Sequence, residues 1–174
     1  MSVRRAHILR QTPVIAALVR TAAVAAARKA GFPPKKQVLP GPTLTATVPP
    51  RSPELVKDYL RAVGAERSWY RGVLPPHLFP HWAFPLLSKT LTDIPYDMTR
   101  VLNGGCRMEM NEPLAADGPL HLRANLEGID DDGRRAVLHQ RIITGTDTEP
   151  DALVCHMYSI VPLKRDKGGK KKER

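Results

Sequence analysis

Residues 120–127 read Leu-His-Leu-Arg-Ala-Asn-Leu-Glu, a strict alternation of apolar and polar side chains. Successive side chains of a β-strand point to opposite faces, so this period of two predicts a strand with one face in a core and the other in water. Residues 106–111, Cys-Arg-Met-Glu-Met-Asn, repeat the pattern. We expect both segments to be half-buried antiparallel strands.

The residues on either side of these two segments predict a larger antiparallel sheet. Asp132-Gly133 is a hairpin-turn dipeptide that directs the chain back beside the strand it leaves. A run of β-branched residues near the start of the chain is typical of a short strand. Three further strands are therefore expected, over residues 43–48, 135–144 and 152–161.

Helices are expected before the sheet. Ser52 can cap a helix whose first position is Pro53 and which Gly64 is suited to end, so residues 53–63 are predicted to be helical. A second helical segment, residues 77–90, contains two prolines and is expected to be bent and buried. The small and apolar residues from Thr12 to Ala30 predict an N-terminal helix that packs against or tethers the rest.

The net charge of +10 is concentrated at the two ends of the chain. Residues 1–53 carry nine Lys or Arg and no acid, and residues 164–174 carry seven against two. Residues 54–163 carry eleven basic against fifteen acidic side chains. Nucleic-acid-binding folds usually present their basic groups on a structured face, so we expect no nucleic-acid partner. Residues 164–174 are interpreted as a solvated basic tail.

The two cysteines and the apolar stretches of the chain indicate where in the cell the protein is expected. Cys106 and Cys155 stand alone, without the spacing of a zinc site or of a disulfide framework, so a cytoplasmic protein without a metal or other cofactor is expected. The apolar stretch Val14 to Ala27 is only 14 residues long and is broken by Arg20. A transmembrane helix needs roughly 20 residues, so none is predicted.

Two segments resemble a known family. They are residues 74–85, LPPHLFPHWAFP, and residues 101–109, VLNGGCRME, with Glu112-Pro113-Leu114 following. Together they resemble the MaoC-like hotdog dehydratases and, more narrowly, the N-terminal, substrate-binding half of double-hotdog members. The resemblance covers about residues 43–163. It implies an α+β hotdog fold, in which an antiparallel sheet wraps a central helix and an acyl chain runs in a tunnel beside that helix.

With the patterns described above, the resemblance divides the chain into three parts. The pattern predicts an N-terminal helix and Pro-rich linker over 1–42 and a basic tail over 164–174, and the resemblance implies a hotdog domain over 43–163. It also implies contacts with the thioester near the leading end of the central helix. The candidate substrate-binding residues are His77, His81, Trp82, Asn103, Gly104 and Gly105. Packing and capping in a Pro-rich loop is the alternative for the histidines, a place in the core is the favoured alternative for Trp82, and a simple strand-entry turn is the alternative for residues 103–105.

The hydratase motif of this family, Asp-x4-His, supplies a general base and a general acid. Five residues before His77 stands Gly72, and five residues before His81 stands Pro76, so neither pair contains a carboxylate. Asp151 and His156 have the right spacing but lie at the start of a predicted strand, where residues five apart point to opposite faces. No catalytic residue is therefore assigned.

These observations predict an acyl-thioester-binding protein of the 3-hydroxyacyl-thioester dehydratase or enoyl-CoA hydratase type. The chain is expected to be the half of a hydro-lyase that is inactive by itself. Its expected partners are acyl-CoA or an acyl-carrier thioester, and either a second copy or a catalytic hotdog half, because a single hotdog domain leaves a sheet edge to cover. The alternative is a non-enzymatic acyl-CoA-binding or scaffold protein.

Overall fold

The computed structural model describes residues 11–34 and 37–163, so the predicted basic tail over 164–174 lies outside the described residues. Helices and strands follow one another along the chain as the sequence predicts. The helices are α2 (Thr12–Lys29), α3 (Pro53–Ala62) and α4 (Pro80–Thr90), with single 3-10 turns η1 (Arg67–Tyr70), η2 (Pro76–Leu78) and η3 (Met98–Arg100). The strands are β1 (Leu44–Val48), β2 (Leu102–Met110), β3 (Leu120–Asp131), β4 (Arg135–Gly145) and β5 (Leu153–Pro162).

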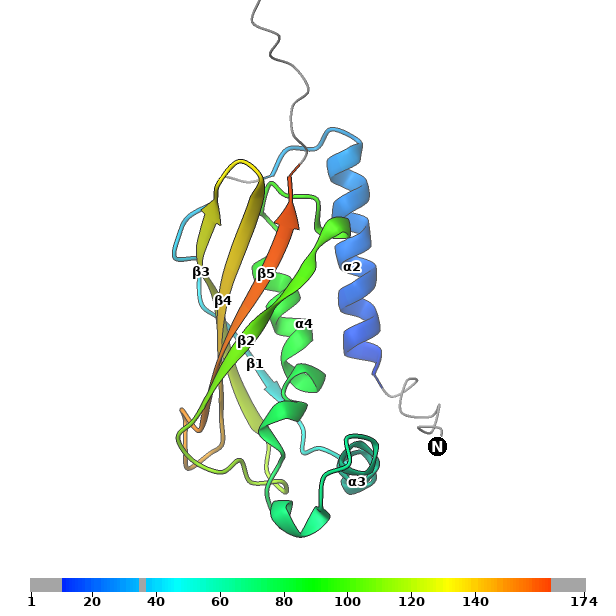
Figure 1. Cartoon of the computed structure of the whole chain (residues 1–174), viewed down its shortest axis with the longest axis vertical. Coiled ribbons are helices and arrows are strands. Elements are labelled where there is room, and N and C mark those ends of the chain that lie inside the picture. The colour runs from blue at the N-terminus through cyan, green and yellow to red at the C-terminus, as the bar shows by residue number, and fades with distance from the viewer. Residues whose placement is uncertain (1–10, 35–36, 164–174) are drawn as a thin grey trace, which may run out of the picture.

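The five strands form one antiparallel sheet in the order β1-β3-β4-β5-β2. The sheet curls around α4, and α2 lies on the far side of α4 from the sheet (Figure 1). This is the predicted arrangement of one central helix wrapped by an antiparallel sheet. No helix in the described part of the chain is long and apolar enough to cross a membrane.

The alternation in β3 places its apolar side chains in the core, as predicted. Leu120, Leu122, Ala124 and Leu126 are each at most 2% exposed, whereas the residues between them are half-buried. The inner face of the sheet packs against Trp82, Ala83, Leu86 and Leu87 of α4. This apolar contact is the main term that stabilises the fold, at about 25 cal/mol per Å² of apolar surface removed from water.

Two buried polar contacts fix the helix on the sheet. The indole N–H of Trp82 donates to the hydroxyl of Thr144 over 3.1 Å, and the side-chain amide of Gln140 donates to the carbonyl of Leu87 over 2.8 Å. Gln140 also donates to the Thr90 hydroxyl. Buried polar groups are costly when unpaired, so these bonds select one position of α4 along the sheet.

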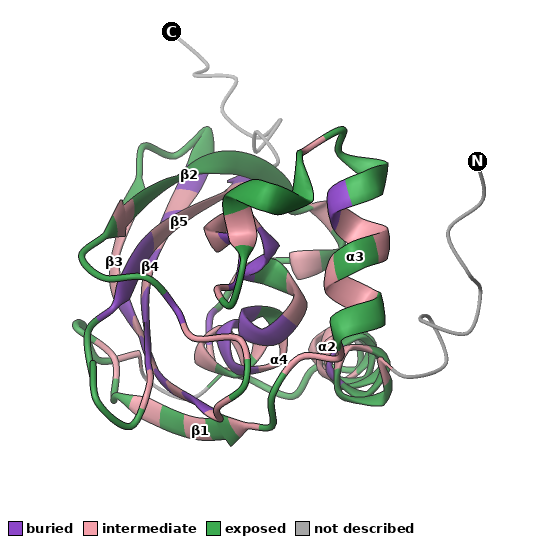
Figure 2. Ribbon diagram, turned by 90° about the horizontal axis from the view of Figure 1, so that it is seen from below, coloured by how far each residue is buried: buried purple, intermediate pink, exposed green. Residues whose placement is uncertain are grey.

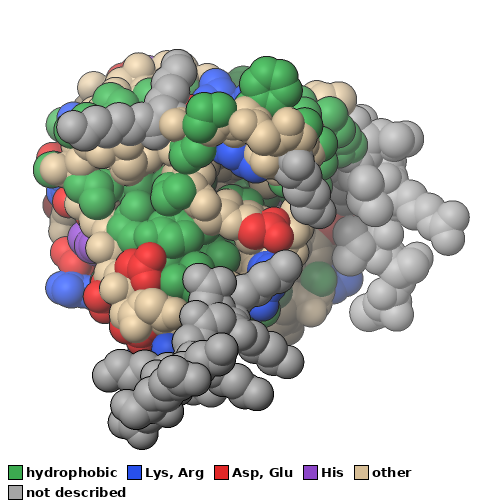
Figure 3. Space-filling model, turned by 90° about the horizontal axis from the view of Figure 1, so that it is seen from above, with side chains coloured by type: hydrophobic (Ala, Val, Ile, Leu, Met, Phe, Trp, Pro, Cys, Tyr) green, Lys and Arg blue, Asp and Glu red, His purple; other side chains and the backbone are tan. Residues whose placement is uncertain are grey.

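A second, smaller core lies at the end of the sheet where the β3–β4 hairpin turns. It combines Ile94, Leu126 and Leu138 with partly buried side chains that include Tyr96 and Met98. Figure 3 views the molecule from this end and shows hydrophobic side chains gathered beside acidic ones. The segment between α4 and β2 is therefore packed against the sheet rather than projecting into solvent.

The local helix signals are confirmed at α3. The Ser52 hydroxyl accepts a hydrogen bond from the Leu55 N–H, and Pro53 occupies the first position. Gly64 follows the helix with a φ of +72°, a conformation that favours glycine. The predicted single bent helix over 77–90 is wrong in detail. Residues 76–78 form a separate 3-10 turn, and α4 begins only at Pro80, because proline at the first helical position breaks no hydrogen bond.

For residues 106–111 the predicted antiparallel strand is confirmed as part of β2, but the predicted burial of one face is wrong. Cys106, Met108 and Met110 lie opposite Met157, Cys155 and Leu153, so they face the core side of the sheet. They are nevertheless exposed, Met108 at 42% and Met110 at 58%. The reason is that β2 is an edge strand and α4 packs mainly against β1, β3 and β4 on the other side of the sheet, so most of β2 is drawn as exposed in Figure 2.

Gly145 at the end of β4 is expected to be intolerant of any side chain. A Cβ there would overlap the backbone carbonyl of Pro150, which cannot rotate away. We expect Gly145→Ala to lower the free energy of unfolding by about 2 kcal/mol in urea denaturation, since forced overpacking costs about 1–3 kcal/mol. Gly118→Ala is the matched control, because nothing lies within 4 Å of its added Cβ. Equal effects of the two substitutions would contradict this reading.

Candidate acyl-binding site

A cavity of about 450 Å³ lies between α2, the C-terminal half of α4, the segment that connects α4 to β2, and the inner face of the sheet. A volume of this size is within the range of small-molecule sites. The side chains that give it its apolar character come from four separate parts of the chain. They are Leu18 and Val24 of α2, Phe84 and Leu87 of α4, Met98 of η3, and Met157 of β5.

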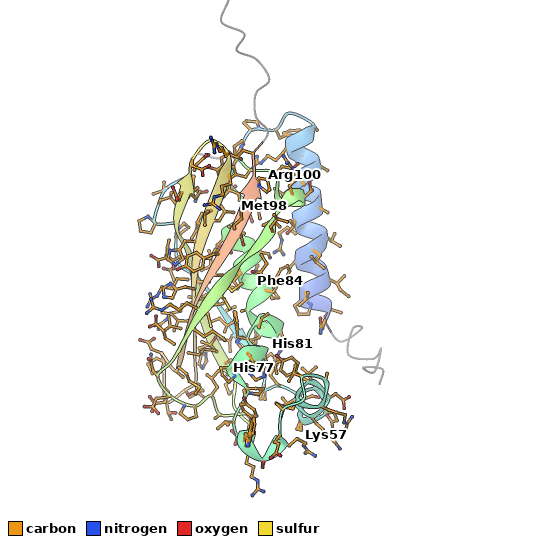
Figure 4. All side chains as sticks on the ribbon, viewed as in Figure 1. Lys57, His77, His81, Phe84, Met98 and Arg100 are labelled. Carbon is orange, nitrogen blue, oxygen red and sulfur yellow. The ribbon has the colours of Figure 1, made fainter. Side chains whose placement is uncertain are left out.

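The apolar lining suits a hydrocarbon chain. Phe84 is 37% exposed and points from α4 toward the α2 side, as Figure 4 shows. Met98 and Met157 add flexible thioether side chains, which adapt to the shape of a ligand better than branched ones. Each methylene that enters such a cavity from water contributes about 0.8 kcal/mol of binding free energy.

Several polar groups of the cavity have partners within the chain. Gln140 donates to α4, as described above. Arg28 of α2 donates to the carbonyls of Phe32 and Thr92 and so ties α2 to the end of α4. Asp97 accepts from the N–H and the hydroxyl of Thr99 and caps η3. These bonds hold the walls of the cavity in place.

Tyr96 closes the end of the cavity near the β3–β4 hairpin. Its hydroxyl donates to the carboxylate of Asp131 over 2.9 Å. Burial and this hydrogen bond raise the pKa of the Tyr96 phenol to about 12. The phenol therefore stays protonated at neutral pH and keeps its role as a hydrogen-bond donor.

His77 lies outside this cavity, in an aromatic cluster. Its ring is 5.3 Å from that of Tyr59 and 5.8 Å from that of Tyr70, and its carbonyl accepts the Tyr59 hydroxyl. His81 is half-buried in the first turn of α4, one turn before Phe84. The two histidines thus lie near the leading end of α4, as predicted from the sequence.

Trp82 is in the core and not at the cavity. It is 2% exposed, and its only donor is committed to Thr144. This geometry agrees with a place for Trp82 in the core and not with contact with a ligand.

Asn103, Gly104 and Gly105 lie at the start of β2, beside an irregularity in its pairing with β5. The Asn103 side chain accepts the Gly105 N–H over 2.8 Å. A Cβ on Gly104 would be 2.9 Å from the carbonyl of Tyr158, and Gly105 has a φ of +103°. The close backbone approach that Gly104 permits is therefore made to β5 of the same chain, whereas Gly105 has the positive φ that favours glycine.

The six predicted site residues do not form one cluster. In Figure 4, His77 and His81 lie near the lower end of α4, whereas Met98 and Arg100, which directly precede β2, lie near the upper end. The start of β2 is next to Arg100 in the chain. The cavity lies along the C-terminal half of α4 and includes Met98, so it extends to the upper of these two groups.

Asp151 and His156 do not form a catalytic pair. Asp151 is paired with Arg123, and His156 is on the outer face of the sheet, where its Nδ1 is 2.9 Å from Nε2 of His139. Burial, and next the neighbouring His139, lower the pKa of His156. The described residues that line the cavity include Asp97 but no histidine, so they do not supply the Asp and His of the hydratase motif.

Sequence reasoning missed the contribution of α2 to the cavity. Ala17 of this helix is 1% exposed, and Thr21, Val24 and Arg28 are half-buried. Their spacing of four, three and four residues is the stripe that a helix buries on one face. This stripe can be recognised in the sequence, but the spacing does not indicate which surface of the protein the stripe covers.

Comparisons with known proteins give likeness in structure only. No family model matches this chain, and no curated protein matches it. One similar solved structure is the C-terminally truncated HadBC (3R-hydroxyacyl-ACP dehydratase) complex from Mycobacterium tuberculosis. Its TM-score is 0.60 at 13% identity, over 72% of this chain and 99% of that one.

Two further structures from Mycobacterium tuberculosis are similar. The ChsH1-ChsH2 complex has a TM-score of 0.53 at 16% identity, over 88% of this chain and 96% of that one. HtdX has a TM-score of 0.59 at 16% identity over 68% of this chain, which spans about half (51%) of the HtdX chain. The sheet wrapped around α4 and these likenesses together show that this chain has the hotdog fold.

Proposed function

We propose that this chain binds the acyl group of an acyl thioester and serves as the non-catalytic subunit of a hydratase or dehydratase. Residues 43–163 form the hotdog domain in this proposal, and α2 completes its acyl cavity. The observation that carries the proposal is the cavity of about 450 Å³ between α2 and α4, with its apolar lining.

The assignment as a non-catalytic subunit is supported by what lines the cavity. Hydration of an enoyl thioester needs a base to activate water and an acid to protonate carbon. Asp97 is the one carboxylate among the described lining residues, and it caps η3. The central helix itself, residues 80–90, contains neither Asp nor Glu.

The requirement for a partner is supported by the exposed edge of the sheet. Strand β2 leaves Leu102, Met108 and Met110 at 42–58% exposure, with an open row of backbone groups beside them. Such an edge is a template for pairing with another chain. Two of the similar structures, HadBC and ChsH1-ChsH2, are complexes of two proteins, and the first is a dehydratase complex.

The test is hydration of crotonyl-CoA and of a longer enoyl-CoA, followed as loss of absorbance of the conjugated thioester. We expect no turnover by the purified chain and saturable binding of both compounds in calorimetry. Cys106→Ala is the control for thiol addition, because Cys106 is exposed. Cys155 is a poor nucleophile, since burial raises its pKa to about 12.

Turnover by the chain alone would overturn the assignment as a non-catalytic subunit. Absence of binding would overturn the acyl-thioester function altogether. Binding without turnover, and turnover on addition of a hotdog subunit that contains Asp-x4-His, is the expected combination. The non-enzymatic alternative predicts binding without turnover in every combination.

A further inference from the structure

A second cavity, of about 420 Å³, lies at the other end of the molecule from the β3–β4 hairpin, beside α3. Its floor is apolar and includes Val56, Leu60 and Val73. Its rim is strongly basic. The cationic side chains that line it are Arg51, Lys57, Arg67 and Arg71, and there is no carboxylate among its described lining residues.

No carboxylate is among the described residues that line this cavity, so none of its lining side chains offsets the basic charge. Arg51 donates to an uncharged group, the carbonyl of Pro49. Four like charges around one cavity repel one another unless an anion lies between them. Burial lowers the pKa of Arg51, which indicates that part of its hydration has been removed.

The chemistry of this cavity fits a phosphate-bearing ligand. A guanidinium group can donate two parallel hydrogen bonds to two oxygens of one phosphate, and the Lys ammonium attracts the phosphate as a compact positive charge. Tyr70 also lines the cavity, and its hydroxyl can donate to a phosphate oxygen. The apolar floor and Tyr70 suit a flat ring attached to the phosphate.

The chain around the start of α4 leads from this cavity to the acyl cavity. Tyr70 lines the basic cavity and has its ring 5.8 Å from that of His77. His77 precedes α4, and His81 lies one turn before Phe84, which lines the acyl cavity. Figure 4 shows Lys57, His77, His81 and Phe84 following one another along this side of the molecule.

We propose that the basic cavity beside α3 holds the phosphorylated nucleotide of coenzyme A while the acyl group occupies the cavity between α2 and α4. This proposal rests on the acyl-thioester function proposed above. It assigns the specificity for the carrier to Arg51, Lys57, Arg67 and Arg71, and it places His77 and His81 on the route between the two ends of the ligand.

The experiment compares three ligands with the same acyl group, namely acyl-CoA, acyl-4′-phosphopantetheine and acyl-pantetheine. Calorimetry on the full chain gives their dissociation constants for the wild type, Lys57→Gln, Arg71→Gln and the double variant. Arg61→Gln is the matched control, because Arg61 lies on the same helix, carries the same charge, and pairs with Asp58 instead of lining the cavity.

We expect each single substitution to weaken acyl-CoA binding about fivefold and the double substitution about twentyfold, as loss of charge-assisted phosphate contacts predicts. Binding of acyl-pantetheine should be unchanged in all variants, and Arg61→Gln should leave all three ligands unaffected. Adenosine 3′,5′-bisphosphate should compete with acyl-CoA but not with acyl-pantetheine. Lys57→Arg should restore most of the affinity.

The outcomes separate this proposal from the acyl-thioester function. Failure of acyl-pantetheine to bind would overturn that function itself. Binding of acyl-pantetheine with no effect of the variants on acyl-CoA would overturn the basic cavity alone. Equal losses for acyl-CoA and acyl-4′-phosphopantetheine would overturn the nucleotide assignment in favour of the phosphate that a carrier protein also presents.

Discussion

Trp82→Ala is expected to lower the free energy of unfolding by about 3–5 kcal/mol, the range for removing a large aromatic side chain from a core. Trp82 is 2% exposed and lies between α4 and the inner face of the sheet. The substitution also leaves the hydroxyl of Thr144, which is 1% exposed, without its donor. An unpaired buried hydroxyl adds about 1–3 kcal/mol to the cost of the cavity.

The measurement is urea denaturation followed by circular dichroism, with the slope of the transition compared between variants. Phe84→Ala is the matched control, since it removes an aromatic side chain from the same helix at a position that is 37% exposed. Its cost should be less than about half that of Trp82→Ala. Trp82→Phe separates the two contributions, because it keeps most of the volume and loses the N–H. Similar losses for Trp82→Ala and Phe84→Ala would contradict the role of Trp82 as the anchor of α4.

The second large effect is expected from Val24→Trp, which fills the acyl cavity from α2. Val24 is half-buried and lines that cavity. If the indole excludes about four methylenes of a long acyl chain, at about 0.8 kcal/mol each, binding weakens by about 3 kcal/mol, or on the order of a hundredfold. A short acyl chain should be bound as before, because it need not enter the blocked part.

Dissociation constants for lauroyl-CoA and butyryl-CoA, measured by calorimetry on the same preparations, test this expectation. Ala22→Trp provides the control, because Ala22 is on the exposed side of α2 and does not line the cavity. It should change neither constant. The location of the acyl group between α2 and α4 would be contradicted if Val24→Trp weakened binding of both acyl-CoAs equally. It would also be contradicted if Ala22→Trp weakened binding as much as Val24→Trp.

The alternating pattern and the helix signals predicted most of the fold. The period of two in β3 predicted both that the segment is a strand and which face of it is buried, because the backbone alone sets the side-chain direction in a strand. Ser52, Pro53 and Gly64 predicted the ends of α3 for a similar reason, since capping involves only neighbouring residues. The prediction was less good for α4, where Pro80 proved to begin a helix and not to bend one.

Local sequence patterns could not predict how far β2 is buried or which residues line the two cavities. Cys106, Met108 and Met110 have the pattern of a half-buried strand, and they do face the core side, but only the strand order places them at the uncovered edge. The acyl cavity combines α2 with β5, and the basic cavity combines Arg51 with Ala116. No period or spacing in the sequence joins such distant segments.

The sequence by itself determined the antiparallel strands, the helix caps and the absence of Asp-x4-His ahead of α4, because each depends on backbone preferences and residue types within a few positions. The tertiary structure alone decided that α2 covers α4, that β2 is exposed, and that the described lining of one cavity holds four cations and no carboxylate. The physical reason is that packing of apolar faces is non-directional, so a buried stripe does not specify its partner until the whole chain has folded.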